Sequence, residues 1–488
     1  MSLERNLKTA GLAAGPILGL SCFAINPGGH PPEARRLLAI LVLAICFWVT
    51  EAIPLPATAL LAAALAIVTG VAPARTVLAP FADPVIFLFV GSFLLSEAFR
   101  KYGLDRRIAG RMLRSRRFGG SPRGLMSGFG LASAGISTCL SNTATAALMT
   151  PIAVGATRDG GGDTKPRSWA PGVLLMVAYG ASVGGMATLI GTPPNLLVAG
   201  FIERLSGVKV SFADWLLFGI PISAVLLILS ILWTRTSAAR HASSEDGAFV
   251  AAPPPAGDES PADRRGRRFT MLAFGLAAFL WTLPALLGLA LGRETPMVAS
   301  VTALLPESAV ALLCACLLFL APIDWRRRRF AMSWEEGREV NWGIILLFGG
   351  GLALGTLAES TGIARWAGEA ISRTSLAATP AGLLGVSIAT AIVISEFASN
   401  TAAATLVVPM VIAAAQAAGF DPVRPALGAG LAATCGFIFP VSSPPNAIVF
   451  GTGLVPLPRM IRTGLLLDIS SFLVIWLGML ALTPLLPR

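Results

Sequence analysis

The sequence predicts an all-α polytopic membrane protein with about eleven transmembrane helices and two re-entrant hairpins arranged as an inverted repeat. Three observations predict this fold. Of the 488 residues, 55% are hydrophobic and 13% are charged, and the mean hydropathy is +0.74, whereas a soluble globular protein carries about 25% charged residues. Apolar stretches of about 18 residues or more recur along the chain, and each can cross about 30 Å of hydrocarbon. Short polar motifs recur at nearly constant spacing. A soluble enzyme is therefore a poor interpretation.

The net charge of +11 is explained by membrane topology without a nucleic-acid partner. With a cytoplasmic N-terminus, the loops expected inside carry 27 lysines and arginines, and the opposite side carries ten. Basic residues collect in cytoplasmic loops, and the run Arg326–Arg329 is the sharpest marker of that side. Only four basic residues are lysines, a bias that favours a GC-rich bacterial source. We expect a multi-pass protein of the bacterial cytoplasmic membrane.

The chain divides into four segments. Residues 1–36 hold a first helix, about 9–26, because no small-residue cleavage site follows this apolar run as in a signal peptide. The first repeat covers 37–235, with spans expected at 37–53, 55–72, 84–101, 170–201 and 213–234 and a re-entrant hairpin at about 122–157. Residues 236–268, rich in Pro and Gly, are expected to form a flexible cytoplasmic linker. The second repeat covers 269–488, with spans expected at 269–291, 298–322, 340–359, 425–454 and 463–485 and a hairpin at about 377–416.

Polar triplets in the middle of apolar segments predict the hairpins. Ser141-Asn142-Thr143 interrupts one segment and Ser399-Asn400-Thr401 interrupts the other. A continuous lipid-facing helix does not suit three polar residues at mid-depth, but two half-helices meeting at a polar tip do. Further along each half, Thr192-Pro193-Pro194-Asn195 and Ser443-Pro444-Pro445-Asn446 each contain paired prolines. Prolines cannot continue a helix, so each motif predicts a helix that unwinds within the membrane.

These motifs are related by an internal repeat. The triplets are 258 residues apart, and the Pro-Pro-Asn motifs are 251 residues apart. Phe89-Val90-Gly91 matches Phe348-Gly349-Gly350 at an offset of 259. Each unit contains five crossings and a hairpin, and an odd number of crossings places the second copy upside down, as in many secondary transporters.

The absence of positive charge near the motifs indicates what they bind. Neither hairpin and neither broken helix has an arginine or lysine near its polar break, and the histidines lie in loops. An anion there would meet only hydroxyls, amides and helix dipoles, which in a low dielectric do not compensate a dianion. Bound cations would supply the charge, and neutral oxygens suit the hard ion Na+. The alternative that these residues only pack helices together is disfavoured because the motifs occur twice in register.

An intramembrane enzyme and a channel are the rival classes. A serine nucleophile needs a nearby base, and no histidine or lysine is placed to act on Ser141 or Ser399. A channel does not need two inverted half-sites. For Glu396, which lies beside the second triplet, we favour a structural role over contact with substrate.

The paired triplets, each followed by a Thr/Ser-Pro-Pro-Asn break, resemble the divalent anion:sodium symporter family (solute carrier family 13 and its bacterial relatives). Supporting motifs are Trp48-Val49-Thr50-Glu51-Ala52-Ile53-Pro54-Leu55-Pro56 and Ser395-Glu396-Phe397-Ala398-Ser399-Asn400-Thr401. The resemblance covers nearly the whole chain. It implies a homodimer in lipid, in which each protomer has a scaffold domain and a transport domain that moves as an elevator.

The resemblance also implies a ligand set. Substrate carboxylates would contact Ser141, Asn142, Thr143, Ser399, Asn400 and Thr401, with Thr192, Pro193, Ser443 and Pro444 lining the site. A first Na+ would use Ser137, Ser141, Asn142 and Gly191, and a second would use Ser395, Ala398, Asn400 and Ser442. The family more often has Thr where this chain has Ser395 and Ser443; the hydroxyl is kept and the methyl is lost. C4-dicarboxylates such as succinate, malate or fumarate are the favoured substrates, with citrate or sulfate, or Na+-independent exchange, as the alternatives.

Overall fold

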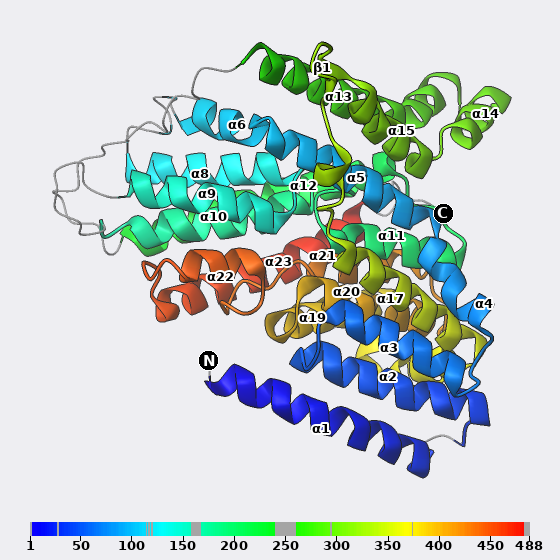
Figure 1. Cartoon of the computed structure of the whole chain (residues 1–488). Helices are drawn as coiled ribbons and strands as arrows, with labels where there is room; N and C mark the ends of the chain where they lie inside the picture. Colours follow the sequence, from blue (N-terminus) through cyan, green and yellow to red (C-terminus); the bar gives the residue numbers. More distant parts are fainter. Residues whose placement is uncertain are drawn as a thin grey trace.

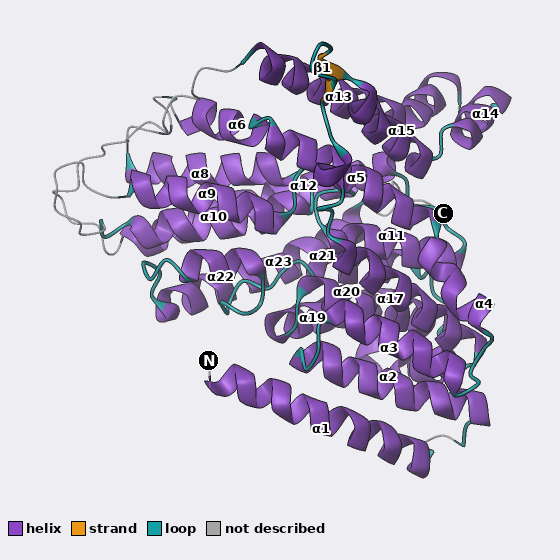
Figure 2. Cartoon of the chain, in the orientation of Figure 1, coloured by secondary structure: helices purple, strands orange, loops and turns teal. Residues whose placement is uncertain are grey.

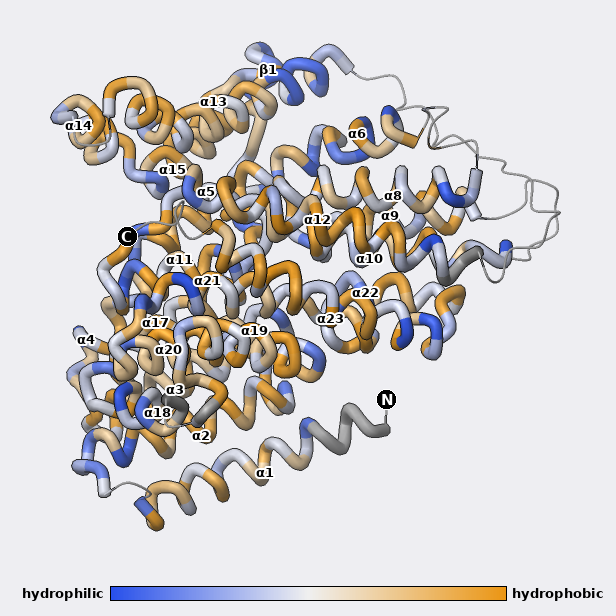
Figure 3. The backbone as a smooth tube through the Cα atoms, turned by 180° about the vertical axis from the view of Figure 1, so that it is seen from behind, coloured by the Kyte–Doolittle hydropathy of each residue, from blue (hydrophilic) through white to orange (hydrophobic). Residues whose placement is uncertain are grey.

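The computed structural model describes residues 2–26, 29–113, 115, 118, 121–157, 167–239, 260–292, 295–372 and 374–482. Over these residues the protein is almost entirely helical, with one short β-hairpin (Figure 2). Hydrophobic residues run along the helices, while hydrophilic residues gather toward their ends and in the loops (Figure 3). This distribution is that of a membrane protein whose helices face lipid and one another.

The regular elements among the described residues of the first half are all helices. In order they are α1 (Ser2–Ile25), α2 (Pro32–Thr50), α3 (Leu55–Val68), α4 (Ala74–Leu78), η1 (Ala79–Ala82), α5 (Pro84–Lys101), α6 (Leu104–Leu113), α8 (Pro122–Ser137), α9 (Asn142–Ala156), α10 (Ala170–Gly185), α11 (Pro193–Ser206) and α12 (Phe212–Ala239).

The second half adds the β-hairpin. Its elements are α13 (Pro261–Leu291), α14 (Pro296–Leu304), α15 (Glu307–Leu320), β1 (Pro322–Asp324), β2 (Arg329–Phe330), α16 (Trp334–Gly337), α17 (Trp342–Ser360), α18 (Ile363–Ser372), η2 (Ser375–Ala377), α19 (Pro380–Phe397), α20 (Asn400–Ala417), α21 (Val423–Ala432), α22 (Pro444–Phe450) and α23 (Leu457–Ala481). Strands β1 and β2 pair antiparallel.

The described chain has eight helices long and apolar enough to cross a membrane, or nine if the bent pair α14 and α15 is one span. This number is lower than the predicted eleven because several predicted spans are short or broken. Helices α3 and α10 have 14 and 16 residues, and the predicted span 425–454 divides into α21 and α22. The predicted span 298–322 bends by 51° where Pro306 caps α15, since proline cannot donate to the preceding turn. Helices α19 and α20, predicted as hairpin arms, are each long enough to cross.

The two halves pack in the same pattern (Figure 1). The first arm of each predicted hairpin packs on the helix that precedes the Pro-Pro break of its own half, α8 on α10 and α19 on α21. The second arm packs on the helix that follows the break of the other half, α9 on α22 and α20 on α11. Helices α12 and α23, which come next in the chain after α11 and α22, pack on each other. The exchanged contacts bring the polar motifs of both halves into one region.

The repeated Phe-Gly motif is a helix-packing device. A Cβ on Gly91 of α5 would lie 2.5 Å from the backbone of Ala311, and a Cβ on Gly350 of α17 would lie 2.5 Å from the Cβ of Ala59. Only glycine permits these close approaches. The rings of Phe89 and Phe348, which match in the repeat, contact each other with centroids 5.3 Å apart. The two copies of the motif are therefore in contact in the buried core.

Contacts near helix ends join segments that are predicted to lie on the same side of the membrane. The guanidinium of Arg235 donates to the carbonyl of Arg123 at 3.0 Å, and that of Arg459 donates to the carbonyl of Ser168 at 3.3 Å. Each contact joins two segments that the positive-inside rule places on the same side. The predicted linker 236–268 is partly helical, because α12 extends to Ala239 and α13 starts at Pro261; residues 240–259 lie outside the described residues.

Candidate functional site

Each polar triplet begins the second arm of its predicted hairpin. Ser141 and Ser399 are the N-caps of α9 and α20, with nearly identical backbone angles of φ −61°, ψ 148° and φ −63°, ψ 147°. Their hydroxyl oxygens accept hydrogen bonds from the N–H groups of Ala144 and Ala402, both at 3.2 Å. A capping serine satisfies a free donor in the first helical turn, so each triplet places a helix N-terminus at the tip.

The triplet asparagines join the two arms. Asn142 Oδ1 accepts a hydrogen bond from Ser137 Oγ at 2.8 Å, and Asn400 Oδ1 accepts one from Ser395 Oγ at 3.0 Å. Both asparagines are buried. The Nδ2 of Asn142 donates to Thr192 Oγ1 at 3.4 Å. The geometry therefore repeats in both halves, with one serine hydroxyl and one amide oxygen paired in each.

Both Pro-Pro motifs start a new helix after a break. Thr192 and Ser443 are the N-caps of α11 and α22 and have extended backbone, and Pro193 and Pro444 follow at the first helical position. Proline is well tolerated there because its missing N–H would have no partner within the helix. The predicted unwinding is thus present at both motifs.

The fourth residue of each Pro-Pro motif clamps the break, a role that the sequence analysis did not assign. Asn195 Nδ2 donates to the carbonyls of Gly185 and Thr188 at 2.9 and 2.8 Å. Asn446 Nδ2 donates to the carbonyls of Gly436 and Phe439 at 2.9 and 3.0 Å. Both asparagines are fully buried. Each asparagine bonds to the residues ten and seven positions before it. The internal repeat marks the two asparagines as equivalent in the sequence, but it does not reveal these hydrogen bonds.

Glycines bring the first hairpin against the first broken helix. A Cβ on Gly191 would lie 2.5 Å from the carbonyl oxygen of Gly185 and 2.9 Å from that of Ser137. A Cβ on Gly185 would lie 2.1 Å from Asn142 Oδ1. Three residues of the first predicted Na+ set, Ser137, Asn142 and Gly191, therefore lie together, with Ser141 next to Asn142 in the chain.

The second predicted Na+ set is brought together in part. Ser395 Oγ also donates to the carbonyl of Ala433 at 2.7 Å, and a Cβ on Gly436 would lie 2.9 Å from the Ser395 carbonyl and 3.0 Å from Ser442 Cβ. Ser395, Asn400 and Ser442 thus surround one short backbone segment. The side chain of Ala398 belongs to an apolar cluster with α2, α3 and α17, so Ala398 could act as a ligand only through its backbone carbonyl.

The two threonines that end the triplets are not fully enclosed by the protein. Thr143 is exposed and Thr401 is half-buried. Among the described residues, neither hydroxyl has an assigned hydrogen bond, so both remain open to a ligand.

Glu396 has the structural role that the sequence favoured. Its buried carboxylate accepts hydrogen bonds from Ser442 Oγ at 2.6 Å, from the N–H of Ile438 at 3.1 Å and from the N–H of Phe439 at 3.2 Å. In the first half Thr138 occupies the matching position, and its carbonyl accepts from Thr188 Oγ1 at 2.6 Å. The second half therefore has a buried carboxyl group beside the site that the first half lacks.

The donor chemistry of the region fits an alkali cation. The segments 137–143, 185–195, 395–401 and 434–446 contain no lysine, arginine or histidine. Over the described residues, no group of three or more His, Cys, Asp and Glu side chains could hold a metal ion, as a transition-metal site would require. These segments offer hydroxyl, amide and carbonyl oxygens together with the Glu396 carboxyl group, and hard cations prefer oxygen ligands.

Comparison with known proteins places the chain in a family. The family model described as "Sodium:sulfate symporter transmembrane region" matches residues 12–486. The sodium-dependent dicarboxylate transporter SdcS of Staphylococcus saprophyticus is 32% identical over 97% of this chain and 91% of the relative, and that of Staphylococcus aureus strain bovine RF122 is 30% identical over 95% and 89%.

A solved structure shares the fold. The YdaH transporter of Alcanivorax borkumensis superposes with a TM-score of 0.57 at 16% identity, covering 84% of this chain and 87% of that protein. Because the family match spans nearly the whole chain, this multi-pass membrane protein belongs to the sodium:sulfate symporter family of transporters, as its resemblance to divalent anion:sodium symporters predicted.

Proposed function

We propose that this protein is a secondary active transporter that moves C4-dicarboxylates such as succinate, malate and fumarate across the cytoplasmic membrane together with Na+. One observation carries the proposal: the pair Ser137–Asn142 and the pair Ser395–Asn400 form the same oxygen-rich arrangement in both halves, without a cationic side chain in the surrounding segments. The sodium-dependent dicarboxylate transporters to which the chain is similar support both the cation and the substrate class.

The chemistry follows from charge balance. A dicarboxylate buried among neutral groups is strongly disfavoured unless its charge is compensated, and two Na+ ions compensate it. In this proposal the first ion uses oxygens near Ser137, Asn142 and Gly191, and the second uses oxygens near Ser395, Asn400 and Ser442. The substrate carboxylates contact the triplets, where Thr143 and Thr401 have hydroxyls without an assigned partner and the N-termini of α9 and α20 favour negative charge.

We further propose that the protein works as a homodimer by an elevator motion. The transport unit would comprise α8–α12 and α19–α23, and the scaffold would comprise α1–α5 and α13–α17. A cavity of about 180 Å³ supports the division: it is lined by α2 and α17 of the scaffold, by α11 and α20 of the transport unit, and by α18, which connects the two units in the chain. Its lining is almost wholly apolar, including Trp48, Leu354 and Met410. An apolar boundary resists sliding less than one held by directional hydrogen bonds, because its contacts are non-directional.

Two alternatives keep specific support. The family description names sulfate, so sulfate or citrate is the second candidate substrate class. Dicarboxylate exchange independent of Na+ is the second candidate mechanism, because fixed helix N-termini alone attract anions.

Uptake of labelled succinate into proteoliposomes tests the function. Symport predicts uptake that an inward Na+ gradient stimulates and that K+ cannot replace. Uptake that requires internal succinate and ignores Na+ would replace symport with exchange, and stronger competition by sulfate or citrate than by malate would change the substrate class.

Variants at the asparagines test the site. Asn142→Ala and Asn400→Ala should each abolish Na+-driven uptake, because each removes the amide oxygen that the arrangement shares between its two arms. Asn341→Ala is the matched control, since Asn341 is an exposed helix cap at α17, outside the site. Normal uptake by Asn142→Ala would refute the site assignment, while normal uptake by the control and its loss in both site variants would support it.

A further inference from the structure

The β-hairpin presents a row of arginines to the surroundings of the protein. Arg326–Arg329 lie in the turn and at the start of β2, and all four are exposed. Arg328 has a left-handed backbone (φ 50°), and the N–H of Arg327 donates to Asp324 Oδ1 at 3.1 Å. These contacts define the turn, and the guanidinium of Arg327 also pairs with Asp324 at 3.9 Å while its side chain stays largely exposed.

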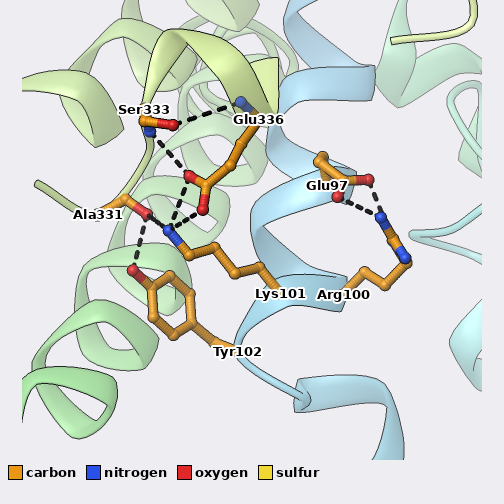
Figure 4. Close-up of polar contacts among 7 residues, drawn as sticks. All are labelled: Glu97, Arg100, Lys101, Tyr102, Ala331, Ser333 and Glu336. Carbon is orange, nitrogen blue, oxygen red and sulfur yellow. Dashed lines mark hydrogen bonds and ion pairs between the residues drawn. The ribbon is translucent and has the colours of Figure 1, made fainter. Parts of the chain in front are cut away.

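The base of this hairpin is firmly attached to the helices. Ala331, directly after β2, is fully buried, and its carbonyl accepts hydrogen bonds from Lys101 Nζ at 3.0 Å and from Tyr102 Oη at 2.7 Å (Figure 4). Lys101 also pairs with Glu336 at 2.7 Å, and Glu336 forms a capping box with Ser333 (Figure 4). The arginines are therefore held at a fixed place beside the end of α5 rather than on a loose loop.

The first turns of α13 extend the positive charge. Arg265 donates to the carbonyl of Ile323 at 3.4 Å, which places the start of α13 against β1, as the upper part of Figure 1 shows. Arg264 and Arg268 are exposed on this part of α13. Asp263 and Asp324 are the acidic residues of these two elements, and α16, which follows β2, adds Glu335 and Glu336. The arginines of the hairpin and of the first turns of α13 outnumber these four acidic residues, so the surface carries an excess of positive charge.

Large aromatic side chains lie beside the arginines. Trp325 is 74% exposed, Trp334 is 66% exposed and Phe330 is 37% exposed. Aromatic side chains with this combination of apolar ring and polar neighbours are enriched where a membrane meets water. We call the exposed arginines Arg326–Arg329, Arg264 and Arg268, together with these three aromatic residues, the hairpin platform.

We propose that the hairpin platform binds the headgroups of anionic phospholipids in the adjacent membrane leaflet. Guanidinium groups bind phosphate oxygens through paired, charge-assisted hydrogen bonds, and clusters of basic residues next to membrane spans attract anionic lipid. The aromatic rings match the acyl boundary below the phosphate, a contact that a free phosphate ion cannot make. A second copy of the chain is a poor occupant, because a twofold interface would bring the same arginines face to face.

This role differs from setting the topology of the chain. Topology depends on positive charge within the loop, whereas a lipid site also depends on the fixed hairpin and on the rings. The two roles therefore predict different effects of Trp325→Ala, which keeps every charge.

Lipid binding to the purified full-length protein tests the proposal. We would count phosphatidylglycerol and phosphatidylcholine molecules bound per protein by native mass spectrometry at 0.05 and 0.5 M ammonium acetate. The test variant and the control variant each replace three exposed arginines. The test set is on the platform: Arg326→Gln, Arg327→Gln and Arg329→Gln. The control set lies in α4, α11 and α18, in segments predicted on the opposite side: Arg75→Gln, Arg204→Gln and Arg365→Gln.

The wild type should prefer phosphatidylglycerol, and the preference should fall at high salt because screening shortens the range of the attraction. The platform triple variant should bind phosphatidylglycerol about 100-fold more weakly, at about fivefold per arginine, while the control variant keeps wild-type binding. Trp325→Ala should reduce binding of both lipids severalfold.

Several results would overturn the proposal. They are a wild type without a headgroup preference, equal losses in the two triple variants, and a platform variant that changes the oligomeric mass without changing lipid binding, which would mark a subunit interface. Because the wild-type preference and its salt dependence need no variant, the proposal stays testable even if the triple variant fails to fold. Succinate uptake is not its readout, so its failure is separate from failure of the transport proposal.

Discussion

Gly185→Ala should disrupt the first cation site while leaving the fold intact. Gly185 is the last residue of α10 and touches the amide of Asn142. Alanine is the better helix former by about 1 kcal/mol, and the backbone of Gly185 needs no special conformation, because its φ is not positive. The only severe contact of the new methyl group is with the end of a side chain, which can rotate away.

The size of the effect follows from the geometry. The added Cβ would lie 2.1 Å from Asn142 Oδ1, and ordinary contact begins at 3.4 Å, so the oxygen must move by 1.3 Å, the difference between the two distances. That movement breaks the 2.8 Å hydrogen bond from Ser137 Oγ. A misplacement of about 1 Å in a preorganised site can cost about 100-fold, so we expect the half-saturating Na+ concentration to rise by at least about tenfold.

The repeat supplies a graded comparison and the chain supplies a control. A Cβ on Gly436, the matching residue, would lie 2.9 Å from the backbone carbonyl oxygen of Ser395 and needs a movement of 0.5 Å. Because a backbone atom cannot rotate away, Gly436→Ala should change the Na+ dependence less than Gly185→Ala but lower the thermal stability more. Gly135→Ala adds a methyl group with nothing within 4 Å and should behave as wild type. The assay is the Na+ dependence of labelled succinate uptake, with thermal stability measured in parallel. Wild-type Na+ dependence in Gly185→Ala, or an equal loss in Gly135→Ala, would refute the reasoning.

Two further predictions concern stability. Asn195→Ala and Asn446→Ala each remove two hydrogen bonds to buried carbonyls and should each destabilise the protein by about 2–3 kcal/mol, seen as a lower melting temperature than that of Asn341→Ala; unchanged melting would show that the clamps contribute nothing. For Glu336, burial raises the carboxyl pKa, but hydrogen bonds from Lys101 and the Ser333 backbone outweigh it, so the pKa falls below its ordinary 4.5. A carboxyl group whose pKa is lower in the folded state than in the unfolded state stabilises the fold at pH values above the unfolded-state pKa. This stabilisation is lost as the pH falls through the folded-state pKa. Glu336→Gln should therefore cost less than about 1 kcal/mol at pH 7, and its melting temperature should converge with that of the wild type below pH 4; a constant difference across that range would contradict the ion pair.

The membrane class, the two halves and the broken helices could be predicted because they depend on local chemistry. A proline pair stops a helix wherever it lies, so the breaks before Pro193 and Pro444 were visible in the sequence. The number of spans was harder to predict. Hydropathy measures how apolar a segment is, but it does not show that α14 and α15 meet at 51° or that α10 is completely buried by protein.

The candidate site was predictable as a set of motifs but not as a set of contacts. The repeat marked Asn142 and Asn400 as equivalent, and the structure gives both the same hydrogen bond from a serine five residues earlier. Ala398, which the resemblance includes in the second cation site, packs its side chain in an apolar cluster, and its part in the site stays a prediction about its backbone carbonyl. The clamp by Asn195 depends on a carbonyl ten residues earlier across a break, which no local pattern reveals.

The sequence by itself determined that this chain is a membrane protein, that its two halves repeat, and that its polar motifs have no positively charged residue near them. These properties depend on residue composition and on short motifs, which do not depend on how distant segments pack. Only the tertiary structure decided which helices pack across the two halves, with α9 on α22 and α20 on α11. It also decided which groups donate hydrogen bonds to the Glu396 carboxyl group. The physical reason is that a buried polar group must find its partners wherever packing places them, and those partners lie tens to hundreds of residues away in the chain.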